Sequence, residues 1–176
     1  MEECAMRDNM PYVRFRALEM EDLEELYEIE NDESLWEVGN TNVPYSRSLL
    51  TDYIASAKCD IYADRQVRMM VENKEGDVIG IVDLINFEPQ HLRAELGIVI
   101  KKAYRHQHYA TAALLKIVEY CKNVIHLHQI YAIVAVDNVY CMSLLKNTGF
   151  QSDIKLKDWL QKGEKYIDAY MMQKIL

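Results

Sequence analysis

The chain has 176 residues, of which half are hydrophobic, and a formal net charge of −8. This length and apolar content predict one compact domain with a hydrophobic core, and the acidic balance argues against general nucleic-acid binding, which needs a basic surface. No apolar run is long enough to cross a bilayer, and the segment MEECAMRDNMPY lacks the apolar stretch of a secretory signal. We therefore expect a cytoplasmic protein without a membrane or nucleic-acid partner, with residues 1–10 as a disordered or frayed leader and residues 11–176 as a single domain.

The first half of the chain predicts three strands and two helices. The strands fall at 12–18, 65–72 and 78–87, and the helices at 19–31 and 46–58, with an irregular segment at 31–45. Residues 73–77 form the turn between the second and third strands, and Ser46 is the expected N-cap of the second helix. The apolar faces of the helices are expected to carry Leu23, Leu26 and Tyr27 in the first and Leu49, Leu50, Tyr53 and Ile54 in the second.

The second half predicts a strand at 94–100, a helix from about 109 to 123, a strand at 129–136, a helix at 138–147 and a final hairpin. Segment 129–136 (QIYAIVAV) is almost continuously apolar, as expected for a central strand buried on both faces. Gly149 is placed where the preceding helix needs a C′ residue. The hairpin pairs 151–160 with 165–175 about residues 162–164.

A short cationic turn at 101–108 joins the strand at 94–100 to the next helix. A strand, a tight turn and a helix together offer unpaired backbone N–H groups to a phosphate, and the helix dipole adds positive potential there. Taken alone, the pattern fits equally well a βα unit with a solvated basic turn. The four cysteines, at 4, 59, 121 and 141, show no metal-ligand spacing, so we expect neither a disulfide nor a metal site.

The segment Arg105-His106-Gln107-His108-Tyr109-Ala110-Thr111 resembles the R/Q-x-x-G-x-G/A turn of the GNAT superfamily of N-acetyltransferases. Arg105 and Ala110 match the motif, whereas His106 and His108 stand where many relatives have glycine. Histidine is among the few residues that adopt positive φ at modest cost. Downstream, residues 137–150 resemble the family's N-x-x-A/S-x-x-L-Y-x-K-x-G-F helix, with matches at Asn138, Leu144, Gly149 and Phe150.

The resemblance covers nearly the whole chain and implies an α/β (α+β) GNAT fold. Such a fold has a central mixed, twisted sheet of about seven strands flanked by about four helices. In the family, the strands that correspond to 94–100 and 129–136 run parallel and splay apart, and the pantetheine arm of acetyl-CoA lies in the splay. The resemblance therefore implies acetyl-CoA as cosubstrate and no requirement for a metal.

The cofactor-binding residues follow from the same resemblance. The backbone of Ile98, Val99 and Ile100 would pair with pantetheine, and the turn Arg105 to Thr111 would hold the pyrophosphate. Asn138 would cap its helix and bond the pantetheine arm, with plain capping as the alternative.

For catalysis, Glu95 is the expected base, because the resembling polyamine enzymes carry a glutamate in the same R-A-E context. The alternatives are a solvated carboxylate or a partner for Arg93. The family's usual acid is the tyrosine at position 145, where this chain has leucine, which cannot donate a proton. Cys141 and Tyr140 are the candidate substitutes. Alternatively, Cys141 is a small side chain that fills the core and Tyr140 is an aromatic residue at the surface.

The closest resemblance is to spermidine/spermine (diamine) N-acetyltransferases, through R-A-E at 93–95, V-D-L at 82–84 and W-x-x-K-G-x-x-Y-x-D-A-Y-M at 159–171. It implies a small amine as the acceptor and allows a homo-oligomer. Acidic residues that could meet a polyamine include Glu33, Glu37 and Asp83. The alternatives are a protein N-terminus, an aminoglycoside, a small amino metabolite, or an acyl-CoA-binding protein without turnover.

Overall fold

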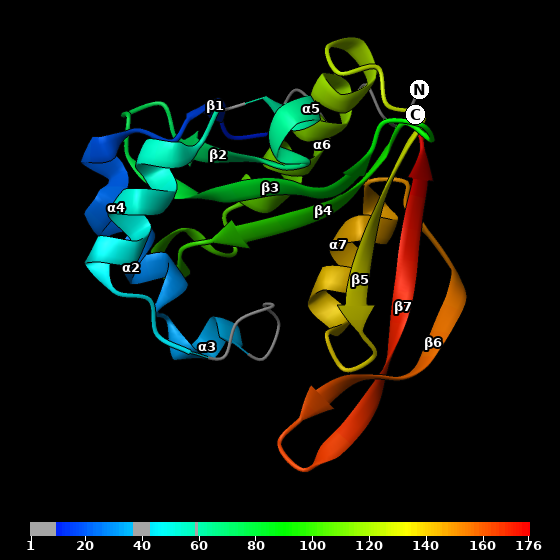
Figure 1. Cartoon of the computed structure of the whole chain (residues 1–176). Helices are drawn as coiled ribbons and strands as arrows, with labels where there is room; N and C mark the ends of the chain where they lie inside the picture. Colours follow the sequence, from blue (N-terminus) through cyan, green and yellow to red (C-terminus); the bar gives the residue numbers. More distant parts are fainter. Residues whose placement is uncertain (1–9, 37–42, 59) are drawn as a thin grey trace.

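The computed structural model describes residues 10–36, 43–58 and 60–176. One mixed sheet contains seven strands in the order β1-β2-β3-β4-β5-β7-β6 (Figure 1). The strands are β1 (Arg14–Ala17), β2 (Val67–Glu72), β3 (Val78–Glu88), β4 (Arg93–Ile100), β5 (Gln129–Ala135), β6 (Gln151–Lys162) and β7 (Lys165–Ile175). Within the described residues only β4 and β5 pair in parallel, and the other neighbouring strands are antiparallel. The predicted sheet of about seven strands is therefore confirmed.

In the part of the chain that the structure describes, four helices of eight or more residues flank the sheet, as predicted: α2 (Leu23–Glu30), α4 (Arg47–Ser56), α6 (Tyr109–Asn123) and α7 (Val139–Asn147). The Ser46 hydroxyl accepts a hydrogen bond from the Leu49 N–H at 3.2 Å, which confirms the predicted N-cap of α4. Two single-turn helices were not predicted, α3 (Glu33–Trp36) and α5 (Ile61–Asp64). The helix predicted from residue 19 begins as a 3-10 turn, η1 (Met20–Asp22), before α2.

The two faces of the sheet are covered by different helices (Figure 1). Helices α6 and α7 pack on one face through the buried side chains of Ala113, Leu114, Ile117 and Leu145. On the opposite face α2 and α4 form a smaller core, whose buried residues are Leu18, Leu26, Ile29, Leu50, Ile54, Met70 and Ile81. Leu49 was predicted on the buried face of α4 but is 52% exposed, because Leu50 and Ile54 already occupy the stripe that faces the sheet.

The parallel strands β4 and β5 pair over only three residues. The pairs are Arg93 with Gln129, Ala94 with Ile130, and Glu95 with Tyr131. Beyond these pairs the strands diverge (Figure 1), which confirms the predicted splay. The edge of β4 that faces β5 is therefore free of strand pairing from Leu96 to Ile100.

Candidate active site

The free edge of β4 presents backbone groups from alternate residues. The Lys101 N–H donates to the Ile79 carbonyl at 2.8 Å, and β3 and β4 stay in register from Gly80–Ile100 to Ile85–Glu95. Because antiparallel ladders alternate, Val99 turns its N–H and C=O toward β3, whereas Ile98 and Ile100 turn theirs toward the splay. Ile98 can therefore pair with an extended ligand through both backbone groups and Ile100 through its N–H, whereas the backbone of Val99 already pairs with β3.

The turn after β4 is fixed by its own polar side chains. Arg105 Nε donates to the Ile100 carbonyl at 2.9 Å, and Gln107 Nε2 donates to the Ala103 carbonyl at 2.9 Å. His106 and His108 have φ values of 62° and 64°, in the left-handed region where the motif usually has glycine. The glycine-like backbone of the turn is therefore present without glycine.

Helix α6 starts at this turn and has an open N-terminus. His108 is its N-cap residue and makes no capping hydrogen bond with its side chain. The first N–H groups of α6, from Tyr109 to Thr111, point out of the helix end, where the helix dipole favours an anion. The sequence thus folds into the arrangement that a pyrophosphate group needs.

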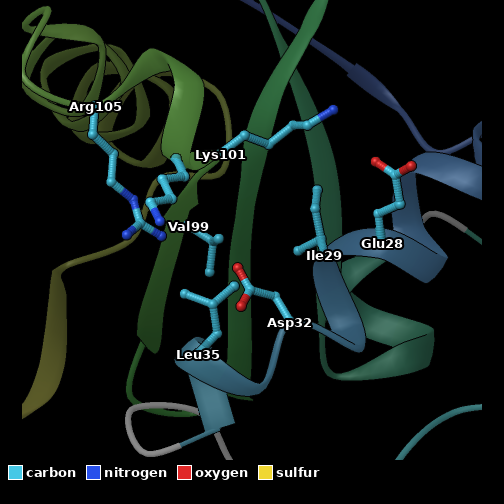
Figure 2. A pocket seen from close by; sticks show the side chains of 8 residues that line it. Glu28, Ile29, Asp32, Leu35, Val99, Lys101 and Arg105 are labelled. Atoms are coloured by element: carbon cyan, nitrogen blue, oxygen red, sulfur yellow. The ribbon is translucent and has the colours of Figure 1, made fainter.

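A pocket of about 200 Å³ lies beside the turn, at the open end of the splay (Figure 2). It is lined by Glu28, Ile29, Asp32, Leu35, Val99, Lys101, Lys102 and Arg105. A hydrogen bond with Ser34 and the positive charges of Arg105 and Lys102 hold the pKa of Asp32 below its usual range. Acidic and basic groups therefore face each other across this pocket. Glu33 is exposed at the start of α3, and Glu37 lies outside the described residues.

Glu95 lies at the closed end of the splay, in the last paired residue of β4. Asn86 Nδ2 donates to Glu95 Oε2 at 2.9 Å. Arg93, the partner that the sequence offered as an alternative, instead binds both carboxylate oxygens of Glu88 at 2.9 Å. Glu95 is half-buried, so its carboxylate is placed by neighbours and still reachable from the solvent side.

The start of α7 carries the three other candidate residues. Asn138 caps α7, since its side-chain oxygen accepts from the Cys141 N–H at 3.1 Å, and its amide nitrogen keeps no partner among the described residues. Burial raises the pKa of the Cys141 thiol, so this thiol stays protonated near neutral pH. Tyr140 is 81% exposed, whereas Leu145 is 1% exposed and belongs to the core.

Asp83 is bound by Arg68, which was not among the site residues predicted from the sequence. Arg68 on β2 binds Asp83 through two hydrogen bonds, Nε to Oδ1 at 2.7 Å and Nη2 to Oδ2 at 2.8 Å, and it also pairs with Glu30 on α2. Arg68 and Asp83 are cross-strand partners in the β2–β3 hairpin. Counting outward from the predicted turn at 73–77 would place Arg68 opposite Val82, and a register shift between Val71 and Glu72 moves it opposite Asp83, so turn position alone could not have predicted this pair.

The described part of the chain contains no cluster of three His, Cys, Asp or Glu side chains that could hold a metal ion. Cys121 and Cys141 are free thiols, and Cys4 and Cys59 lie outside the described residues. Among the helices of the described residues, none is both long and apolar enough to span a bilayer.

The family model described as an acetyltransferase (GNAT) domain matches residues 13–151. The chain belongs to the GNAT family. It is 26% identical to a spermidine N(1)-acetyltransferase of Vibrio cholerae over 157 residues. The aligned part is 89% of this chain and 89% of the relative. A 116-residue part, 64% of this chain and 72% of the relative, is 27% identical to an L-amino acid N-acetyltransferase of Escherichia coli.

Solved structures of the Vibrio cholerae spermidine N-acetyltransferase share this fold. The crystal structure of its complex with CoA and spermine aligns with a TM-score of 0.83 at 26% identity, over 93% of this chain and 95% of that one. A structure described as dodecameric aligns with a TM-score of 0.77 at 25% identity, over 93% of each chain. Our chain is accordingly an N-acetyltransferase that uses acetyl-CoA, and its free β4 edge, turn and open α6 terminus fit that cosubstrate.

Proposed function

We propose that the protein acetylates a primary amine of a diamine or polyamine of the spermidine type, at the closed end of the β4–β5 splay. The observation that carries this proposal is Glu95, a reachable carboxylate in the last residue pair before the strands diverge. The names of the matched Vibrio cholerae proteins support the acceptor class. Acetyl-CoA supplies an acetyl thioester, and the residues of the chain bind it, orient it and move protons.

The binding roles follow from the exposed backbone groups. The edge of β4 at Ile98 and Ile100 would pair with the pantetheine amides, while Val99 contributes its side chain to the pocket wall. The turn from Arg105 to Thr111 would hold the pyrophosphate. The amide nitrogen of Asn138 would donate a hydrogen bond to the pantetheine arm while its oxygen keeps capping α7.

Two proton transfers remain for side chains. Glu95 would take a proton from the acceptor ammonium group, directly or through one water, so that the nitrogen lone pair becomes free for attack. The C–N bond then forms as the C–S bond breaks, the nitrogen gives up its second proton to water, and the leaving sulfur needs a proton or a hydrogen-bond donor. The protonated thiol of Cys141 would supply it, with the hydroxyl of the exposed Tyr140 as the alternative donor.

The ammonium group of the polyamine that is not acetylated would pair with Glu33, the first residue of α3, and with Glu37, which follows α3 in the sequence. Asp83, also a candidate, would have to release a bidentate arginine that is itself mostly buried, and such a separation leaves two poorly solvated charges. We therefore assign the remote ammonium group to Glu33 and Glu37 ahead of Asp83. A homo-oligomer is part of the proposal, supported by the dodecameric relative, and so is a cytoplasmic location.

The test is release of CoA from acetyl-CoA, followed with a thiol reagent. The purified protein is mixed with spermidine, spermine, a panel of aminoglycosides, L-amino acids and short peptides with free N-termini. We expect release with di- and polyamines, and a loss of about 10²-fold or more in Glu95→Gln. Glu164→Gln, in the exposed turn between β6 and β7, is the matched control and should keep full activity.

Other outcomes of this assay are equally informative. Release only with L-amino acids would replace the polyamine by the acceptor class of the Escherichia coli relative. Thermal stabilisation by acetyl-CoA without release for any amine would favour an acyl-CoA-binding protein without turnover.

A further inference from the structure

Residues from both strands that flank β4 converge on Glu95. On one side is Asn86 from β3, and on the other is Tyr131 from β5. Neither belongs to the motifs that identify the family fold in the sequence. Building on the proposed function, we infer that Asn86 and Tyr131 are positioning residues that aim the Glu95 carboxylate at the acceptor amine.

The position of Asn86 depends on a β-bulge. Between the pairs Ile85–Glu95 and Glu88–Arg93, β3 has one residue more than β4. Leu84 and Phe87 are both buried in the core on the α6 and α7 face, although strict alternation would place residues 84 and 86 on that face. Asn86 is therefore the extra residue, and its φ of 52° turns its side chain to the face of Glu95.

This bulge has a cost that packing does not explain. A non-glycine residue in the left-handed region is uncommon, and asparagine is one of the few that tolerates it. The Asn86 side chain is exposed, so it fills no core space, and its recorded hydrogen bond goes to Glu95 Oε2. Bulges that re-aim a single side chain are over-represented next to active sites.

Tyr131 approaches Glu95 from the other side. Ala94 and Leu96 on β4 and Ile130 and Ala132 on β5 are buried on the α6 and α7 face. By alternation, Glu95 and Tyr131 both project from the opposite face, directly across from each other. Burial and the negative charge of Glu95 raise the pKa of Tyr131. Its hydroxyl therefore stays protonated and can donate to the carboxylate.

With the Asn86 amide bound on one side and Tyr131 paired across the strand on the other, the carboxylate has limited freedom to rotate. Glu88 and Arg93 also face Tyr131, and because they pair with each other, they do not compete for Glu95. A base held in one rotamer needs less reorganisation during proton transfer, and a small misplacement of a catalytic group can cost a large factor in rate.

The test is a double-mutant cycle on the full-length protein with acetyl-CoA and the best amine from the panel. Asn86→Gly removes the amide but keeps a residue that adopts positive φ, and Tyr131→Phe removes only the hydroxyl. Each should lower kcat about tenfold while leaving the Kd for acetyl-CoA and the Tm nearly unchanged. In a Glu95→Gln background neither change should lower kcat further, because a positioning residue acts only through its target.

Two further variants sharpen the test. Asn86→Asp keeps the size and backbone preference but places a like charge beside Glu95, so it should lose more activity than Asn86→Gly. Tyr170→Phe removes a tyrosine hydroxyl from β7, from a residue that packs with the core on the α6 and α7 face, and should leave kcat unchanged.

The outcomes separate this inference from the proposed function. Equal losses in the wild-type and Glu95→Gln backgrounds, or no loss in either single variant, would overturn the positioning role while leaving the transferase intact. Full activity in Glu95→Gln would overturn the base assignment and the positioning role with it. Absence of CoA release from the wild-type protein with every amine would overturn the proposed function itself.

Discussion

Gly80 on β3 allows the close approach that holds the cofactor edge of β4 in place. A Cβ atom built on Gly80 would lie 2.1 Å from the Val99 carbonyl oxygen, and 3.1 Å from Ile100 Cα. Both neighbours are backbone atoms, so no side-chain rotation can relieve the clash. The variant Gly80→Ala must therefore move β3 and β4 apart at the open end of the splay, where Ile98 and Ile100 present their backbone groups.

Over-packing of this kind costs about 1–3 kcal/mol, which for a chain of this size lowers Tm by roughly 2–4 °C per kcal/mol. The displacement of Ile100 should also weaken acetyl-CoA binding. Gly97→Ala is the matched control, because its Cβ would meet only Asp83 Cβ at 3.5 Å, an ordinary contact. Differential scanning fluorimetry with and without acetyl-CoA measures both effects. Equal Tm and equal ligand stabilisation in the two variants would refute the reasoning.

Four other predictions concern the turn, an ion-pair cluster and helix α7. His108→Val should destabilise the fold by about 1–2 kcal/mol and weaken acetyl-CoA binding, whereas His108→Gly should keep binding, because only the second tolerates the φ of 64°; titration calorimetry distinguishes them. Hydrogen bonds from Arg16 and Arg14 hold the pKa of Glu72 below its usual range. The stability they contribute is therefore present above the unfolded-state pKa and lost as pH falls through the lowered folded-state pKa, and Arg16→Gln should flatten the acid limb of a urea-denaturation series below about pH 4.5. Cys141→Ala should lower kcat about tenfold without changing the Kd for acetyl-CoA, as steady-state kinetics and calorimetry would show; unchanged kcat would leave Tyr140 as the donor. Leu145→Tyr should lower Tm by several degrees and fail to raise activity, because Leu145 is 1% exposed; a stable, faster variant would contradict this.

The long elements could be predicted from the sequence because their periodicity agrees with their burial. Ser46 caps α4 and Gly149, with a φ of 87°, follows α7 as expected. The single-turn helices α3 and α5 could not be predicted from periodicity, since four residues do not complete a pattern. Helix α5 had a local signal in Asp60, whose carboxylate accepts from the Tyr62 N–H at 2.9 Å.

The site was predicted in part, and the misses share a physical cause. The splay and the positive φ values at His106 and His108 follow from a motif that is contiguous in the sequence. The contacts of Glu95 depend instead on strand register and on a bulge at Asn86, which alternate patterning does not reveal. The sequence carries one sign of this bulge in the segment Leu84-Ile85-Asn86-Phe87. Its two core residues, Leu84 and Phe87, are three positions apart, whereas regular alternation would separate them by two.

The leucine at position 145 changes how the family mechanism can operate in this chain. Leu145 lies in the closed core between α7 and α6, so a hydroxyl there would be buried among apolar side chains without an evident partner. Cys141 lies four residues earlier, on the same face of α7. Its thiol is kept protonated by burial, which raises its pKa, so it can donate a hydrogen bond to the departing sulfur of CoA, although complete proton transfer to that thiolate is uphill. In the proposed mechanism the donor has therefore moved by one helical turn, and the chain needs no tyrosine at position 145 to complete the transfer.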